Sequence, residues 1–136
     1  MKTTAKWVSN LAFDVISDSG HVARLDTTKD AGSLNSGMRP KKMLLGALNT
    51  CSGMDVISIL DKMKVSYTKL EVESEAEQTD DHPKVFKSIH MVYKSDVKQE
   101  DLDKLKRAIE LSQDKYCGIS AMLKKHCDIT YEIELS

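Results

Sequence analysis

The sequence lacks the features that mark secreted, membrane-spanning or nucleic-acid-binding proteins. Its amino-terminal segment, MKTTAKWVSNLAFDV, contains no apolar run of the roughly 7–15 residues that a secretory signal needs. No stretch reaches the roughly 20 uninterrupted apolar residues of a membrane-spanning helix. A formal net charge of −1 and short lysine pairs are unlike the basic footprint of a nucleic-acid-binding protein. We therefore predict a cytoplasmic protein with no membrane or nucleic-acid partner.

Cysteine is scarce, and its number is odd. The chain has three cysteines, at positions 51, 117 and 127. In a reducing compartment such a set does not form a framework of structural disulfides. Any disulfide here is expected to be transient and catalytic.

Several catalytic and metal-binding signatures are also missing. There is no G-x-S-x-G nucleophile elbow, and GSLNSG (32–37) lacks the Lys-Ser/Thr ending of a phosphate-binding loop. No C-x-x-C or H-x-x-x-H pair exists, and His126 and Cys127 are adjacent rather than spaced as metal ligands. Nor does any spacing pair the carboxylates of Asp14, Asp26 and Asp55 as general acid and base. We expect neither a metal nor a cofactor.

Length and hydrophobic period predict one α+β domain spanning residues 1–136. Alternating apolar residues around a Gly20 turn predict a hairpin over 6–28, and Pro40 opens a long helix over 40–63. The remaining elements are expected as strands at 64–77 and 85–96, an amphipathic helix within 98–113, a short helix within 114–127 and a closing strand at 128–136. Short turns between adjacent strands favour antiparallel pairing.

The helix over 40–63 has a broad apolar face, which predicts a central helix covered on most sides. Cys51 lies in its middle, so its thiol serves either packing or chemistry, and spacing alone leaves both readings open. Cys117 lies near the start of a later helix. If it lies in the first turn after a cap at Ser112 or Asp114, the helix dipole and unpaired backbone N–H groups favour its thiolate. Cys127 is interpreted as packing.

Two segments carry a resemblance to a known family. RPKKMLLGALNTCSGMDVISIL (39–60) resembles the central-helix signature of the OsmC/Ohr family, in the branch described as YhfA-like. YCGISAML (116–123) is similar to the second cysteine motif of that family. The two motifs stand in the family's order, and the resemblance covers nearly the whole chain.

The resemblance implies an OsmC-like fold, in which antiparallel sheets wrap around two long central helices of an intertwined homodimer. It also implies a thiol-dependent peroxidase that reduces organic hydroperoxides. Cys51 matches the peroxidatic cysteine and Cys117 the resolving cysteine, and an external dithiol reduces the resulting disulfide. The alternative is a non-catalytic dimer of the same fold, acting as a redox sensor or binding a small apolar ligand.

One departure from the family concerns the charge that activates the thiol. Peroxidase members use an arginine held by a glutamate in the first turn of the central helix, but Lys41 and Lys42 stand there in this sequence. Arg39 is our first choice for the activating cation, and Arg24 is the second.

The surroundings of the thiols are also predicted from the motifs. Met54 and Met122 are candidates to line an apolar substrate pocket, although methionines at such positions are often plain core. Ser52 and Ser120 are candidate hydrogen-bond donors near the thiols, with local helix capping as the alternative.

Overall fold

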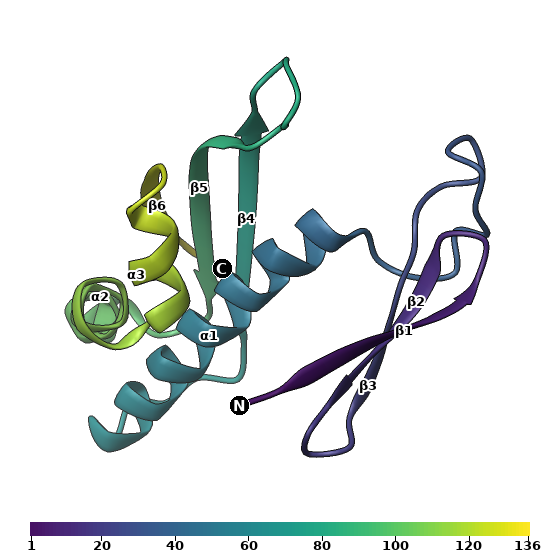
Figure 1. The fold of residues 1–136 in the computed structure, drawn as a ribbon. Coiled ribbons are helices and arrows are strands. Elements are labelled where there is room, and N and C mark those ends of the chain that lie inside the picture. The colour runs from purple at the N-terminus through teal and green to yellow at the C-terminus, as the bar shows by residue number, and fades with distance from the viewer. The chain divides into compact units, whose positions relative to one another are not determined.

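Two three-stranded sheets, joined by a long helix, organise the chain (Figure 1). The computed structural model describes residues 1–136, which divide into two compact units, Met1–Leu44 and Leu45–Ser136. The first unit contains the sheet β1-β2-β3, and the second contains the sheet β4-β5-β6. Helix α1 (Pro40–Lys62) starts in the first unit and continues through the second. The class is α+β as predicted, and the reading of residues 1–136 as a single domain stays a prediction.

The first sheet has three antiparallel strands: β1 (Thr3–Ser9), β2 (Ala12–Ser17) and β3 (Val22–Leu25). The predicted hairpin around Gly20 is confirmed as the antiparallel pair β2–β3. Its first strand was predicted too long, because a tight turn separates β1 from β2. Asn10 adopts a left-handed conformation there, with φ of 48°, which asparagine tolerates better than most residues. The Trp7 indole N–H donates to the Asn10 carbonyl oxygen at 2.9 Å.

The loop after β3 is organised by one buried carboxylate, that of Asp26. It accepts hydrogen bonds from the Ser33 hydroxyl, the Ser36 hydroxyl at 2.7 Å, and the backbone N–H groups of Ser36 at 2.9 Å and Thr27 at 2.7 Å. The Ser33 hydroxyl foremost, with these other donors, holds the pKa of Asp26 well below its usual range. The loop that leads into α1 thus depends on an ionised Asp26.

Helix α1 begins at Pro40, as predicted, and ends at Lys62. Its fully buried positions form one stripe at intervals of four residues: Leu48, Ser52, Val56 and Leu60. The expectation of a helix covered on most sides is not met in the single chain, since Leu44 and Met54 are exposed. By length and composition alone α1 could cross a membrane. Its stripe of fully buried residues packs into the core of the second unit.

The second sheet combines both kinds of strand pairing. Strands β4 (Leu70–Gln78) and β5 (Phe86–Ser95) are antiparallel, whereas β6 (Asp128–Leu135) runs parallel to β5. The expectation of antiparallel pairing was therefore wrong for β6. A parallel neighbour requires a crossover, which here consists of a 3₁₀ turn (Gln99–Asp101), α2 (Leu102–Leu111), a π-helical turn (Ser112–Tyr116) and α3 (Gly118–Lys124).

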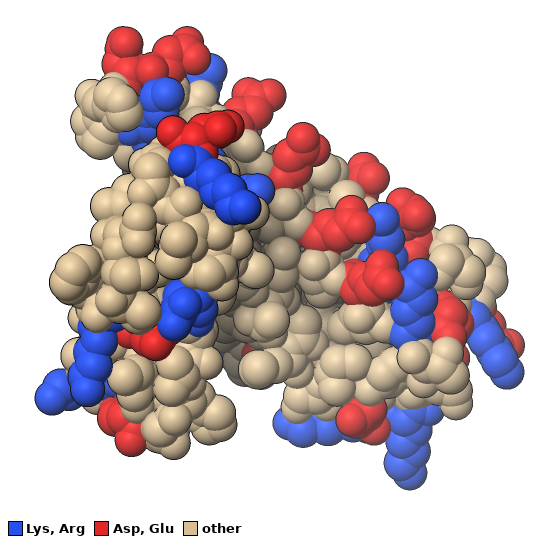
Figure 2. All heavy atoms as spheres, turned by 90° about the vertical axis from the view of Figure 1, so that its right-hand side faces the viewer, with Lys and Arg blue, Asp and Glu red and all other residues tan.

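The core of the second unit lies between its helices and one face of this sheet. The predicted amphipathic helix is confirmed, since α2 buries Leu105, Ala108 and Ile109. These residues join Ile89, Met91 and Tyr93 of β5 and the α1 stripe. The other face of β4 carries exposed glutamates at 71, 73, 75 and 77. On the surface shown in Figure 2, acidic and basic side chains are interspersed rather than separated by sign.

The low pKa of Asp26 predicts acid sensitivity of the first unit. A carboxyl whose folded-state pKa is depressed stabilises the fold above its ordinary pKa and loses that contribution as the pH falls towards the folded value. We expect the urea midpoint of the wild-type protein to drop between about pH 4 and pH 2 more steeply than that of Asp26→Asn. Asp30→Asn, which changes an exposed carboxyl in the same loop, is the control. Identical pH profiles for the wild type and Asp26→Asn would contradict the assignment.

Candidate functional site

Cys51 lies on α1, immediately before the buried residue Ser52. Its side chain is partly exposed and packs against the core at the edge of the Leu48–Ser52–Val56–Leu60 stripe. A thiol at this position is supported by a rigid helix and is still open to a reactant. All three cysteines of the chain are free thiols in this structure.

Cys117 is buried and begins α3 as its N-cap residue. Its Sγ accepts the backbone N–H of Ser120 at 3.3 Å, and its own N–H donates to the Ser112 carbonyl oxygen at 2.8 Å. The expected cap at Ser112 or Asp114 is wrong, because residues 112–116 form a π-helical turn and the helix starts only after Cys117.

The two thiols interact, and their settings differ. Burial raises the pKa of Cys117 to about 11, even though the Ser120 N–H favours the thiolate. Cys51 and the carboxylate of Asp55 are close enough to raise the Cys117 pKa further. Near neutral pH Cys117 is therefore a thiol, because burial outweighs the N–H donor that favours its thiolate.

A buried amide links Cys117 to the sheet. Gln113, in the π-helical turn, accepts the Ser120 hydroxyl on Oε1 at 2.8 Å. Its Nε2 donates to the Tyr93 hydroxyl at 2.7 Å and to the Met91 sulfur at 3.2 Å. These residues are all buried. The Gln113 amide thus uses both donors and its acceptor inside the core.

The same series of hydrogen bonds continues to α1. The Tyr93 hydroxyl lies 2.5 Å from Ser52 Oγ, which lies 2.8 Å from Ser112 Oγ, and Ser112 donates to Asp55 Oδ2 at 3.0 Å. Since a carboxylate only accepts, the single hydroxyl proton of Ser112 goes to Asp55. Ser52 then donates to Ser112, and Tyr93 donates to Ser52. We call Asp55, Ser112, Ser52, Tyr93, Gln113 and Ser120 the buried polar network.

Sequence reasoning found only part of this network. Ser52 and Ser120 were predicted as hydrogen-bond donors near the thiols, and both form side-chain hydrogen bonds in the core. Tyr93 and Gln113 were missed, because they lie on a strand and a turn that no motif spacing connects to α1. A serine within the otherwise apolar α1 stripe was the available signal, since a buried hydroxyl needs a partner.

The two candidate arginines belong to the first unit, whereas Cys51 belongs to the second. Arg24 is already engaged: its Nε lies 2.5 Å from Asp14 Oδ1, and this hydrogen bond lowers the pKa of Asp14. Arg39 is exposed and directly precedes α1. The identity of the cation that activates Cys51 stays a prediction.

The two candidate pocket methionines are both exposed, 72% for Met54 and 65% for Met122, so neither is a core residue in the single chain. Met54 lines a cavity of about 750 Å³ in the second unit, together with Ile57, Leu70 and Val72. A second cavity, of about 390 Å³, is lined by Asp55, Ile59, Met63, Leu111 and Tyr116, among others. Met122 lines neither cavity.

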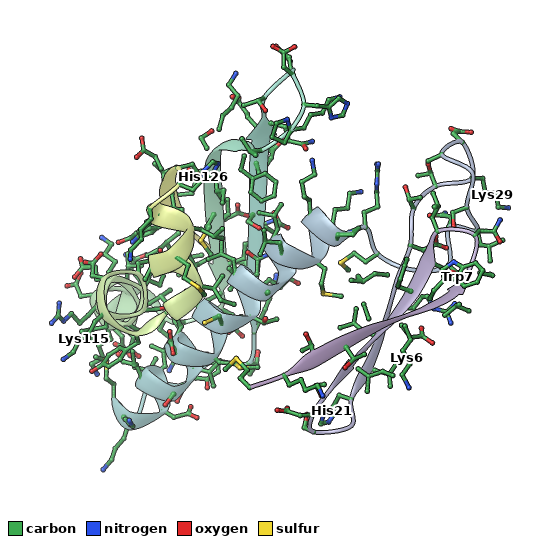
Figure 3. All side chains as sticks on the ribbon, viewed as in Figure 1. Lys6, Trp7, His21, Lys29, Lys115 and His126 are labelled. Atoms are coloured by element: carbon green, nitrogen blue, oxygen red, sulfur yellow. The ribbon has the colours of Figure 1, made fainter.

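The remaining nucleophilic and metal-ligating side chains do not gather into a second site. His126 lies just beyond the carboxyl end of α3, whereas Lys115 precedes the amino end of this helix (Figure 3). The His126 Nε2 lies 3.0 Å from the Phe86 carbonyl oxygen. Cys127 is buried, and this burial raises its pKa. The structure contains no group of three or more His, Cys, Asp or Glu side chains arranged to hold a metal ion.

Comparisons with known proteins agree on one family. The family model described as OsmC-like protein matches residues 32–132. Protein YhfA of Escherichia coli strain K12 is 32% identical over 135 residues, which cover 99% of this chain and 98% of that protein. An OsmC-like protein from Mycoplasma pneumoniae shares the fold with a TM-score of 0.82 at 16% identity, over 98% of this chain and 95% of that one. The organic hydroperoxide resistance protein OhrB of Bacillus subtilis shares it with a TM-score of 0.65 at 18% identity, over 98% and 96% of the two chains.

The central position of Tyr93 in the buried polar network predicts a loss of stability in Tyr93→Phe. This change removes the oxygen acceptor of the buried Gln113 Nε2 and one of the two hydrogen bonds of the Ser52 hydroxyl, at a cost of about 1–3 kcal/mol in the free energy of unfolding. Chemical denaturation measures it. Tyr131→Phe is the matched control, because Tyr131 is partly exposed, and its expected effect is within about 0.5 kcal/mol. Equal stabilities of the two variants would show that the network contributes nothing.

Proposed function

Because the chain belongs to the OsmC-like protein family, we propose that it is a thiol-dependent peroxidase that reduces organic hydroperoxides. The observation that carries the proposal is the pair of interacting thiols, one partly exposed on α1 and one buried at the start of α3. Solved proteins of the same fold include organic hydroperoxide resistance proteins, such as OhrB of Bacillus subtilis.

The settings of the two thiols support their assignment. Cys51 is the thiol that a peroxide reaches, since Cys117 is only 3% exposed. The Cys51 thiolate attacks the outer peroxide oxygen, the O–O bond breaks, and the leaving alkoxide takes up a proton to give the alcohol. Cys51 is thereby oxidised to a sulfenic acid. A thiol with a pKa of about 11 is a poor first nucleophile near neutral pH, which suits Cys117 to the resolving role.

Resolution and reduction complete the cycle. The Cys117 sulfur attacks the Cys51 sulfenic acid, and the hydroxyl group leaves with the thiol proton as water, forming a disulfide. An external dithiol reduces this disulfide by two exchange steps and is itself oxidised. Because such a cycle needs a reducing thiol pool, we propose a cytoplasmic location.

We also propose that the protein acts as a homodimer. Large apolar side chains are exposed on each unit when it is considered by itself, among them Trp7 and Val22 in the first and Met54 and Met122 in the second. Exposed apolar surface of this kind marks an interface. A sedimentation-equilibrium mass of a single chain would contradict the dimer.

The cavity of about 750 Å³ favours a second candidate function, the non-catalytic binding of an apolar ligand, with oxidation of the thiols serving as a signal. Its wall includes Met54, Ile57, Leu70 and Val72. In that case peroxide consumption stops at one equivalent per chain even in excess dithiol, whereas a peroxidase continues to turn over.

The cysteines provide a matched set of variants for the peroxidase proposal. With cumene hydroperoxide as substrate and dihydrolipoamide in excess, we expect steady peroxide consumption by the wild type and its loss, by about a hundredfold or more, in Cys51→Ser. Without dithiol, Cys117→Ser consumes peroxide at Cys51 but forms no intramolecular disulfide. Cys127→Ser, which changes another buried cysteine, retains wild-type turnover. Turnover by Cys51→Ser at the wild-type rate would refute the proposal.

A separate prediction concerns the activating cation, which we propose to be Arg39. Removing a charge that stabilises the attacking thiolate is expected to slow the reaction of Cys51 with both cumene hydroperoxide and iodoacetamide, by roughly tenfold to a hundredfold in Arg39→Ala. Arg107→Ala is the control, since Arg107 is exposed on α2. If Arg24→Ala slows both reactions and Arg39→Ala does not, the role belongs to Arg24.

A further inference from the structure

One buried side chain links α3, which begins after Cys117, to β5, the strand whose Tyr93 hydrogen-bonds to α1. Gln113 makes three side-chain hydrogen bonds, to Ser120 on α3 and to Tyr93 and Met91 on β5. Its backbone carbonyl oxygen also accepts Lys124 Nζ at 2.8 Å, from the far end of α3. It is 4% exposed, so these hydrogen bonds form with little competition from water.

The partners of Gln113 are adjacent to the reacting groups. Ser120, whose hydroxyl Gln113 accepts, donates its backbone N–H to Cys117 Sγ. Tyr93, to which Gln113 donates, hydrogen-bonds to Ser52, the residue that follows Cys51 on α1. One amide therefore links the residue that binds the Cys117 sulfur to the neighbour of Cys51.

We propose that Gln113 is a positioning residue that holds Cys117 and Cys51 in the relative position that disulfide formation requires. This inference rests on the proposed peroxidase function. A disulfide forms only when the two Cα atoms lie within about 4.4–6.8 Å and the Cβ atoms face one another, so small displacements of α3 against α1 slow the step. Attack of Cys51 on the hydroperoxide does not depend on the position of Cys117.

The consequence is a competition at the Cys51 sulfenic acid. Resolution joins the two sulfurs and releases water. If resolution is slow, a second hydroperoxide oxidises the sulfenic acid to a sulfinic acid, and its O–O bond breaks to release an alcohol. Loosening the network therefore converts productive turnover into over-oxidation of Cys51.

The experiment follows each step in single-turnover reactions with cumene hydroperoxide, without dithiol. Trapping of the sulfenic acid with dimedone reports the first step, and mass spectrometry of the disulfide and sulfinic acid reports its fate. In Gln113→Leu, Ser120→Ala and Tyr93→Phe we expect sulfenic acid to form at the wild-type rate. Disulfide formation is expected to slow by about tenfold or more, and sulfinic acid to appear at lower peroxide concentration.

Ser95→Ala is the matched control. Ser95 is also fully buried, and its hydroxyl donates to the Lys69 carbonyl oxygen at 2.8 Å, outside the buried polar network. It is expected to resolve at the wild-type rate despite a similar loss of stability. Ser120→Ala, a small change, covers the case in which Gln113→Leu does not fold.

The outcomes separate the two proposals. If the wild type forms neither sulfenic acid nor disulfide, the peroxidase proposal fails. If the wild type forms both and the folded network variants resolve as fast as Ser95→Ala, the positioning role of Gln113 is refuted and the peroxidase remains. Slow resolution in Ser95→Ala as well would also refute it, because the effect would then follow general destabilisation.

Discussion

The arrangement of the second unit depends on the requirement that buried polar groups be paired. Ser52, Ser112 and Tyr93 have no access to water, so each hydroxyl must find its partner inside the protein. The carboxylate at the end of the series, Asp55, accepts from Ser112, and this fixes the direction of the hydroxyl hydrogen bonds that lead to it. These hydrogen bonds constrain how α1, β5 and the π-helical turn pack against one another. An apolar core would permit neighbouring packings of similar energy.

The same requirement gives the two thiols different chemical settings. Cys117 is buried with a single N–H donor at its sulfur, and burial outweighs that donor, so its pKa rises to about 11. Cys51, at the edge of the α1 stripe, remains partly exposed. An asymmetric pair of this kind suits a reaction in which one sulfur meets the oxidant and the other meets only the first sulfur. Rigid positioning of the second thiol then matters more than its intrinsic reactivity.

The first unit shows a comparable use of carboxylates. The Asp26 carboxylate accepts hydrogen bonds from hydroxyl and backbone N–H groups within residues 27–36, and Asp14 binds Arg24. Arg24 is thereby held on its own sheet by a carboxylate, a role that the family's central-helix glutamate plays for another arginine. With lysines at 41 and 42, the first turn of α1 offers no such acid. Of the two candidate arginines, Arg24 is bound to Asp14 and Arg39 is not.

Features set by neighbouring residues could be predicted from the sequence, whereas features that depend on distant segments could not. The long helix, the amphipathic α2 and the two cysteine motifs are local patterns, and each was legible in one segment. The turn at Asn10 was not predicted, because it interrupts an alternating pattern without changing its period. The parallel pairing of β6 was not predicted either, because it depends on a crossover of more than thirty residues. The partners of Ser52 lie 41 and 60 residues away. A buried serine in an apolar stripe demands a partner, but only the fold determines that the partners are Tyr93 and Ser112.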